Sequence, residues 1–375
     1  MPWQERCTMS LRQEFLFLAN QPGSNFSQLC QRFGISRKTG YKWRQRHRQD
    51  SNDALVDRSR RPRRSPRRSE PELERQALMI RDETGWGARK IKWSLETAGQ
   101  GPVAKSTVHS NLCRHGRVPA SPEQVTSSYQ RFEQERPNQL WQMDFKGHFQ
   151  LGNRERCHPL TVLDDRSRYS LCLQACRNEQ TVTVKERLTA TFRRYGLPER
   201  MLMDNGSPWG SDREHQHTLL TVWLLRLGIA VSHSRPYHPQ TQGKDERFHR
   251  TLKVELLAHR SFGDFECMQS SFDKWRHRYN HQRPHEALGM AVPATCYQVS
   301  NRSFPEQLPA PEYGTIDQVR KVQTDGKISF RHREFQVGRA FRGNPVAVRP
   351  TTEDGIYDVH FASHKITTID LNKAQ

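Results

Sequence analysis

The chain has 375 residues, of which 34% are hydrophobic and 27% charged, and its formal net charge is +20. This length allows two to four domains, and the low apolar fraction favours several small, well-solvated domains over one large core. So basic a chain is expected to bind nucleic acid by releasing counterions from phosphates, and a merely soluble basic protein is the less favoured alternative.

Other classes of protein are disfavoured by what the sequence lacks. Its eight cysteines include no CxxC pair and no zinc-finger spacing with histidine, so we expect free thiols in a reducing compartment. No signal-like apolar stretch opens the chain, and no run of about 18 apolar residues occurs in it. We therefore expect a soluble protein without membrane association.

Residues 1–50 are expected to form a helix-turn-helix DNA-binding module. An apolar stripe and a turn at Gly34 precede Ser36, which fits the N-cap of a basic helix. In this motif the second helix enters the major groove, although a basic solvated helix face is the alternative. The stripe is Phe26, Leu29, Phe33 and Ile35, and the candidate DNA contacts are Arg37, Lys38, Lys42 and Arg44.

Residues 51–70 are expected to form an Arg-rich linker. Its arginines alternate with Pro62, Pro66 and several serines, a composition that cannot bury a core. Such linkers follow phosphates or lie in a minor groove, and a purely solubilising linker is the less favoured alternative. The candidate DNA contacts here are Arg60, Arg61, Arg63 and Arg64.

Residues 71–118 are predicted to form a second helix-turn-helix module. One helix begins at Trp86–Ile91 and another at Lys105–Val108, with a turn cluster at Ala98–Pro102 between them. Ser106 is expected to cap the second helix, and Lys105, Ser106 and Thr107 are the candidate DNA contacts. Two such modules joined by a basic linker predict a bipartite DNA site.

After a polar linker at 119–137, residues 138–300 are expected to form an α/β core with a mixed five-stranded sheet. Three consecutive strands are followed by alternating helices and strands. Residues 301–375 are expected to form a small all-β, barrel-like domain. Its expected strands are the alternating runs Lys327–Phe330, Phe335–Val337, Val346–Val348 and Tyr357–Val359.

Three carboxylates of the core stand in contexts suited to metal binding. Asp144 lies in an apolar strand-like run, and Asp204 ends another apolar run just before a turn. Glu246 opens a helix after a loop rich in Pro and Gly. Two strand-end aspartates and one helix glutamate can converge on a pair of Mg²⁺ ions, which prefer oxygen ligands. This pattern predicts cleavage or joining of phosphodiesters.

The motifs Gln142–Gly147, Asp204–Ser207 and Pro239–Lys253 closely resemble the catalytic core of DDE-type insertion-sequence transposases, which is shared with retroviral integrases. Tyr279–Gly289 is similar to the segment that follows that core. The resemblance implies a ribonuclease H-like fold in which Asp144, Asp204 and Glu246 hold two Mg²⁺ ions, with Mn²⁺ able to substitute. It also implies cleavage and transfer of DNA strands at terminal inverted repeats, by a homo-oligomer on double-stranded element and target DNA. No small-molecule substrate is expected, and the expected location is the bacterial cytoplasm, on the nucleoid when DNA is bound.

The chain departs from the family in two places. Residues 205–245 make the connection between Asp204 and Glu246 longer than is common, and the surplus is expected around Gly210–His217, since surface loops tolerate insertion. The N-terminal zinc module of retroviral integrases is replaced here by the helix-turn-helix pair.

The neighbours of Glu246 suggest further roles. Arg250 and Lys253 fall on the same helix face, where they would dock a phosphate. Asp245 is a rival ligand about 100° away on the helix, and a solvated or helix-start carboxylate is the favoured interpretation. A turn role is expected for Asp164 and Asp165, and a core role for Trp141, Phe145 and Phe248. His238, Gln240 and Lys244 are further candidate DNA contacts, with a loop-shaping role open for the first two.

Two alternative functions are also considered for this sequence. One is a sequence-specific DNA-binding regulator derived from a transposase whose core is idle, which the intact acidic set disfavours. The other is a nuclease of the same fold without strand transfer, which the helical modules disfavour.

Overall fold

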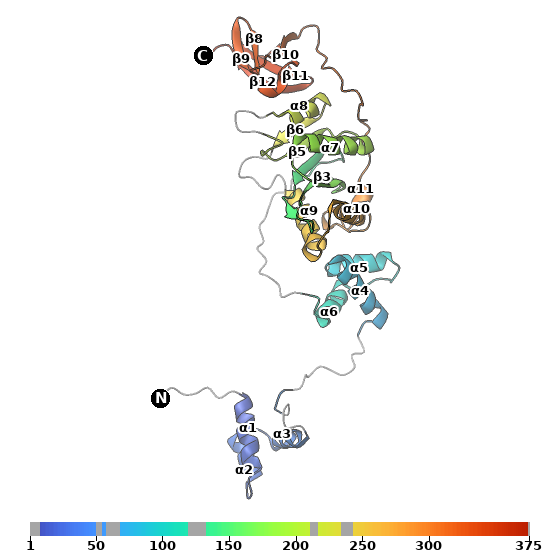
Figure 1. The fold of residues 1–375 in the computed structure, drawn as a ribbon. Coiled ribbons are helices and arrows are strands. Elements are labelled where there is room, and N and C mark those ends of the chain that lie inside the picture. Colours follow the sequence, from blue (N-terminus) through green and yellow to red (C-terminus); the bar gives the residue numbers. More distant parts are fainter. Residues whose placement is uncertain are drawn as a thin grey trace. The chain divides into compact units, whose positions relative to one another are not determined.

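A computed structural model describes residues 8–49, 55–57, 68–118, 133–210, 217–233 and 243–373 (Figure 1). The chain divides into two compact units, Met1–Arg68 and Ser69–Gln375. Several predicted positions lie outside the described residues, together with most of the segment where the loop surplus was expected. These positions are Arg60, Arg61, Arg63, Arg64, His238 and Gln240.

The first unit contains the helices α1 (Thr8–Ala19), α2 (Phe26–Arg32) and α3 (Arg37–Gln49). Phe15 contacts the rings of Phe26 and Phe33 edge-on, and the predicted apolar stripe packs around it. The turn between α2 and α3 places Gly34 at φ +62°, a conformation that glycine adopts without cost. The Ser36 hydroxyl accepts the Thr39 N–H at 3.2 Å, so the predicted cap of the basic helix is confirmed.

The second unit begins with α4 (Pro71–Thr84), α5 (Ala88–Thr97) and α6 (Lys105–Arg114), which enclose a small core of their own. The prediction that Ser106 caps α6 is wrong. The N-cap is Ala104, whose extended backbone precedes Lys105, so Ser106 already lies inside the helix. The turn before α6 is held by Glu96 instead, whose carboxylate accepts the Val103 N–H at 3.0 Å.

A mixed sheet forms the centre of the second unit. Its order is β4-β3-β1-β5-β6, with the short β2 (Phe149–Gln150) beside the beginning of β3. The pairs β1–β3 and β3–β4 are antiparallel, whereas β1–β5 and β5–β6 are parallel. The predicted α/β core with a mixed sheet is thereby confirmed. The main strands are β1 (Leu140–Phe145), β3 (Arg156–Asp164), β4 (Ser170–Cys176), β5 (Arg200–Met203) and β6 (Ala230–His233).

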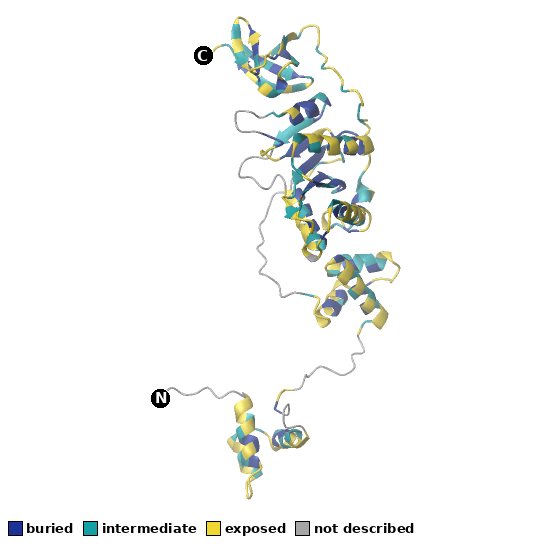
Figure 2. Ribbon diagram, in the orientation of Figure 1, coloured by how far each residue is buried: buried dark blue, intermediate teal, exposed yellow. Residues whose placement is uncertain are grey.

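Helices cover both faces of this sheet, and alternation along the strands divides the core in two (Figure 2). Leu160 and Val162 of β3 join the cluster that contains α7 (Thr181–Tyr195) and α8 (Leu219–Arg226). Leu163 joins the opposite cluster, which contains α9 (Gly243–Glu255) and α10 (Phe265–His281). Trp141 and Phe248 are buried and Phe145 packs on the core, as expected. Shorter helical segments are η2 (Leu257–His259), η3 (Glu286–Leu288) and α11 (Pro293–Cys296).

The C-terminal part is all-β, as predicted. A four-stranded antiparallel sheet of order β12-β11-β10-β7 is joined by the hairpin β8-β9 and the short helix η4 (Arg339–Phe341). Sequence analysis missed β7 and β12, the two edge strands, because most of their side chains lie at least partly in solvent and lack an apolar alternation. The strands are β7 (Gln318–Lys321), β8 (Lys327–Phe330), β9 (Arg333–Gln336), β10 (Pro345–Pro350), β11 (Ile356–Phe361) and β12 (His364–Asp370).

Two absences concern the described part of the chain only. The seven cysteines that the structure describes are free thiols. Within the same residues, no helix combines the length and the apolar character needed to cross a membrane.

The last turn of α10 ties that helix to the sheet, and the residues just after it tie it to α9. The Asn280 amide pairs with both backbone groups of Ser170, accepting its N–H at 2.8 Å and donating to its carbonyl at 3.0 Å. Arg283 forms a buried ion pair with Glu255 at the end of α9, at 2.9 Å. These contacts hold α9 and α10 against the sheet, on the face that carries the candidate site.

We predict that Asn280→Ala lowers the free energy of unfolding of the core by about 2 to 4 kcal/mol, because it leaves two buried backbone groups of Ser170 without partners. The measurement is urea unfolding of the full chain followed by tryptophan fluorescence. Gln282→Ala is the matched control, since that side chain is exposed and its removal should cost less than about 0.5 kcal/mol. Equal unfolding midpoints for the two variants would contradict the role given to Asn280.

Candidate active site

Asp144 lies near the end of β1, opposite Thr161 of β3 in the strand register. Its carboxylate accepts the Phe145 N–H at 2.8 Å. Partial burial raises the pKa of Asp144 to about 6, the Phe145 hydrogen bond opposes that rise, and the charges of Asp204, Glu179 and Glu246 add to it. Asp204 and Glu246 of the predicted triad therefore each lie within electrostatic reach of Asp144.

Asp204 and Glu246 reach this region from different elements. Asp204 directly follows β5, which runs parallel to β1, so the two aspartates lie at the same edge of the sheet. The exposed Asp204 carboxylate accepts the N–H of Asn205 at 2.7 Å. Glu246 lies in the first turn of α9, also exposed. Both side chains are accessible to a cation or to DNA.

Asp245 is where the structure differs most from expectation. A solvated or helix-start carboxylate was predicted. Asp245 does lie in the first turn of α9, but it is only 1% exposed. The reason is the apolar face of α9, since Phe248 and Leu252, at i+3 and i+7 from Asp245, pack against the sheet. That packing turns Asp245 inward and Glu246 outward.

The buried side of α9 creates a group that can hold a metal ion. One ligand atom each of Asp144, Asp245 and His249 lies within 4.8 Å of the others. Two carboxylates and an imidazole suit a divalent cation. The Mg²⁺ that the resemblance implies prefers oxygen ligands, which the carboxylates of Asp144, Asp204 and Glu246 supply. Sequence analysis missed His249. Its spacing of four residues from Asp245 on one helix face is the signal that could have identified it.

Thr161 connects the members of this group. Its hydroxyl lies 2.9 Å from the Asp144 carbonyl oxygen and 2.9 Å from His249 Nε2. Both carboxylate oxygens of Asp245 are farther away, at 3.4 Å. Burial raises the pKa of Asp245 well above its usual value, and the Asp144 charge adds to the effect. Burial lowers the pKa of His249 to about 3, with Lys146 contributing.

Asp164 and Asp165 have the turn role expected of them. Asp164 accepts the Ser167 N–H at 2.8 Å and the Ser167 hydroxyl at 2.6 Å, which closes the turn between β3 and β4. Asp165 is buried and accepts the Gln142 amide at 2.8 Å. Neither carboxylate belongs to the group around Asp144.

Lys244, a candidate DNA contact, forms an intramolecular ion pair. Its ammonium lies 2.5 Å from the buried Asp165 carboxylate, and the Lys244 side chain is 18% exposed. Burial lowers the pKa of Lys244, although the Asp165 hydrogen bond opposes that shift. The pair anchors the first turn of α9, so Lys244 fixes the turn of the helix that carries Asp245 and Glu246. Arg250 and Lys253 are exposed on the same helix.

The candidate DNA contacts of α3 separate into two groups. Arg37, Lys38 and Lys42 are exposed. Arg44 is half-buried, with its guanidinium over the Phe26 ring at 5.6 Å. Sequence analysis missed Tyr41, which is 57% exposed although its ring stacks on Phe26. Its position between Lys38 and Lys42 on one helix face is the signal that could have found it. In α6, Lys105 and Ser106 are exposed and Thr107 is half-buried.

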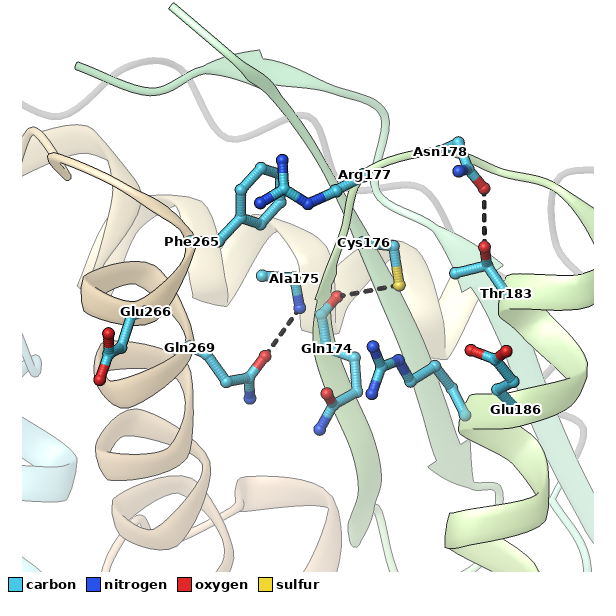
Figure 3. Close-up of a pocket in the computed structure, with 11 residues that line it drawn as sticks. Gln174, Ala175, Cys176, Arg177, Asn178, Thr183, Glu186, Phe265, Glu266 and Gln269 are labelled. Carbon is cyan, nitrogen blue, oxygen red and sulfur yellow. Dashed lines mark hydrogen bonds between the residues drawn. The ribbon is translucent and has the colours of Figure 1, made fainter. Parts of the chain in front are cut away.

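A cavity of about 390 Å³ opens elsewhere in the core, between β4, α7 and α10 (Figure 3). Cys176 and Phe265 line it together with polar side chains such as Gln174 and Gln269. The Gln269 amide oxygen accepts the Ala175 N–H at 2.8 Å, so this side chain supplies a partner for a backbone donor of the edge strand β4. The lining includes none of the carboxylates grouped around Asp144.

We predict that Lys244→Ala lowers the free energy of unfolding of the core by about 3 kcal/mol, because it leaves the buried Asp165 without its cation. Chemical denaturation of the full chain measures the change. Lys253→Ala, on the exposed face of the same helix, should stay within about 0.5 kcal/mol of the unchanged protein. An equal effect of the two substitutions would show that Lys244 has no anchoring role.

Family models match this chain in five places. An integrase core domain matches residues 134–239 and a second integrase core model matches residues 227–293. The C-terminal domain of IS481 family transposases matches residues 317–375. A homeodomain-like domain matches residues 39–112, and a helix-turn-helix domain matches residues 11–63.

Relatives include proteins of bacterial insertion elements. The IS407 protein of Burkholderia multivorans is 26% identical over 158 residues, which is 42% of this chain and 54% of the relative. The IS476 protein of Xanthomonas euvesicatoria is 29% identical over 160 residues, 42% of this chain and 44% of the relative. The chain thus spans about half the length of these insertion-element relatives.

Among solved structures, the HTLV-2 integrase catalytic core domain in complex with magnesium aligns with a TM-score of 0.34 at 14% identity, covering 44% of this chain and 99% of that one. The family matches bear out the resemblance found in the sequence. The chain carries helix-turn-helix domains, an integrase core domain and the C-terminal domain of IS481 family transposases.

Proposed function

We propose that this protein is a DNA transposase that binds the terminal inverted repeats of its element and catalyses divalent-metal-dependent strand cleavage and strand transfer. The observation that carries the proposal is the accumulation of acidic side chains around Asp144, at one edge of the sheet, in a chain whose net charge is +20. Like charges gathered in this way destabilise one another unless cations compensate them. A strongly basic protein with such an acidic site fits an enzyme that handles phosphodiesters.

The roles of the carboxylates follow from their exposure. Asp144, Asp204 and Glu246 would hold the cations. The resemblance to DDE-type transposases implies two Mg²⁺ ions, for which Mn²⁺ would substitute. When bound, these cations would polarise the scissile phosphate and activate a water or a DNA 3′-hydroxyl. The exposed Arg250 and Lys253 of α9 would dock the phosphate beside Glu246. The same site would serve cleavage of the element end and its transfer to target DNA.

The helical modules would select the DNA. The exposed face of α3 offers Lys38, Tyr41 and Lys42 to a major groove, and α6 offers Lys105 and Ser106. Strand transfer requires two element ends to be held together, so the protein would act as a homo-oligomer on DNA. A regulator with an idle core and a nuclease without strand transfer are the competing functions, and the next experiment separates them.

We predict that the purified full-length protein, with Mg²⁺, nicks duplexes made from the DNA that flanks its gene and joins the nicked ends to a second duplex. Each of the substitutions Asp144→Asn, Asp204→Asn and Glu246→Gln should reduce both products by a factor on the order of 100 or more, as expected when one preorganised charge-stabilising group is removed. Denaturing gels of end-labelled DNA measure both steps.

Controls decide among the three functions. Binding of the flanking duplexes should survive all three substitutions. Specific binding by the unchanged protein without metal-dependent cleavage would favour the regulator, and nicks without joined products would favour the nuclease. Full activity in the Asp204→Asn or Glu246→Gln variant would show that Asp144, Asp204 and Glu246 are not the catalytic set of carboxylates.

The first helical module allows a separate prediction about DNA contacts. Lys42→Ala should weaken binding and reduce the slope of log affinity against log salt by about 1, as expected for the loss of one phosphate contact. Arg44→Ala should leave that slope unchanged, because its half-buried guanidinium packs on Phe26. Fluorescence anisotropy at several salt concentrations measures both. An equal loss of slope in the two variants would contradict the division of α3 into an exposed and an inward group.

A further inference from the structure

The buried carboxylate of Asp245 has no close hydrogen-bond donor among the described residues. Its contacts with donor groups there are Thr161, at 3.4 Å to each oxygen, and His249, at 3.7 Å. Hydroxyl hydrogen bonds are normally about 2.5–3.0 Å long, so the Thr161 contacts are at the far limit. Among those same residues, no lysine or arginine forms an ion pair with Asp245 or with Asp144.

The hydrogen bonds of the Thr161 hydroxyl explain why it is a poor donor to Asp245. A threonine hydroxyl carries one proton. The Asp144 carbonyl oxygen, at 2.9 Å, can only accept, so it takes that proton at the short distance. The hydroxyl oxygen is then free to accept a proton from His249 Nε2, also at 2.9 Å. This arrangement leaves no Thr161 proton for the oxygens of Asp245.

His249 is placed to supply a nitrogen ligand. Its side chain is 13% exposed, and one of its ring nitrogens lies within 4.8 Å of carboxylate oxygens of Asp144 and Asp245. Imidazole is a common metal ligand. Nε2, which lies 3.7 Å from Asp245, would release the Thr161 hydroxyl to bind a cation. A cation among the three side chains would give Asp245 the close partner that the described residues do not supply.

We propose that Asp144, Asp245 and His249 form a divalent-cation site that prefers Mn²⁺ to Mg²⁺. The preference follows from the donor set, because imidazole suits transition metals whereas Mg²⁺ favours oxygen ligands and retains its waters. The site deepens the proposed function and rests on it only through Asp144, which the two sites share. A cation at this site would lie on the buried side of Asp144. Asp204 and Glu246 would hold cations on the exposed side of Asp144.

The test uses the full-length, chelator-treated protein in an imidazole-free buffer, with MnCl₂ or MgCl₂ as the probe and no DNA. Isothermal titration should give tighter binding of Mn²⁺ than of Mg²⁺. Asp245→Asn and His249→Gln should each weaken Mn²⁺ binding by about 10- to 100-fold and remove its advantage over Mg²⁺. Glu266→Gln is the matched control, since this exposed carboxylate at the start of α10 belongs to neither proposed site, and it should retain the Mn²⁺ preference.

A spectroscopic readout separates a ligand from a structural residue. Pulsed electron paramagnetic resonance of the Mn²⁺-loaded, unchanged protein should show nitrogen coupling to the ion, and His249→Gln should abolish it. Thr161→Val, which keeps both carboxylates and the imidazole, should retain the coupling, because Thr161 supplies none of the three ligand atoms. Absence of nitrogen coupling in the unchanged protein, or equal Mn²⁺ affinity in Asp245→Asn, would overturn the proposal.

The two proposals can fail separately. If the unchanged protein cleaves and joins DNA but its Mn²⁺ shows no nitrogen coupling, the buried cation site is wrong and the transposase function stands. If the nitrogen coupling depends on His249 but neither cleavage nor joining occurs, the cation site stands and the proposed function is wrong.

Discussion

The packing of α9 against the sheet is the constraint on which the candidate site depends. Phe248 and Leu252 are buried in the core, and burial of two large apolar side chains contributes several kcal/mol, about 1.5 to 3 for each. Rotating the helix to expose Asp245 would expose these side chains as well. The hydrophobic face therefore determines which of two adjacent carboxylates faces the sheet and which faces solvent, and the buried one is held beside Asp144.

Electrostatics gives this arrangement its chemical character. The protein is strongly basic as a whole, yet the edge of the sheet at Asp144 gathers several carboxylates. In the proposed function, the charge of the whole chain would attract DNA, while the local acidic group would attract the cations that phosphodiester chemistry requires. The buried ion pair of Lys244 with Asp165 and that of Arg283 with Glu255 lie at opposite ends of α9 and fix the helix that carries Asp245, Glu246 and His249.

Much of the fold could be predicted from the sequence, because alternation and turn residues are local signals. The strands around Asp144 and the cap at Ser36 are examples. The edge strands β7 and β12 escaped prediction because they lack an apolar alternation. The inward orientation of Asp245 could not be derived from helix geometry alone. Helix geometry places Asp245 and Glu246 about 100° apart around the helix axis. Which of the two points into the protein depends on which face of α9 packs against the sheet. Arg44 differs from Lys42 for the same kind of reason, since Arg44 is half-buried near Phe26 whereas Lys42 is exposed.

The central claim is that divalent cations bind at Asp144, between a buried and an exposed set of ligands. Anomalous diffraction from crystals of the protein soaked in MnCl₂ tests it most directly. The account predicts an anomalous peak in contact with the Asp144 carboxylate, with Asp245 and His249 on its buried side or Asp204 and Glu246 on its exposed side. Manganese peaks that lie only elsewhere on the protein, with none at Asp144, would contradict it.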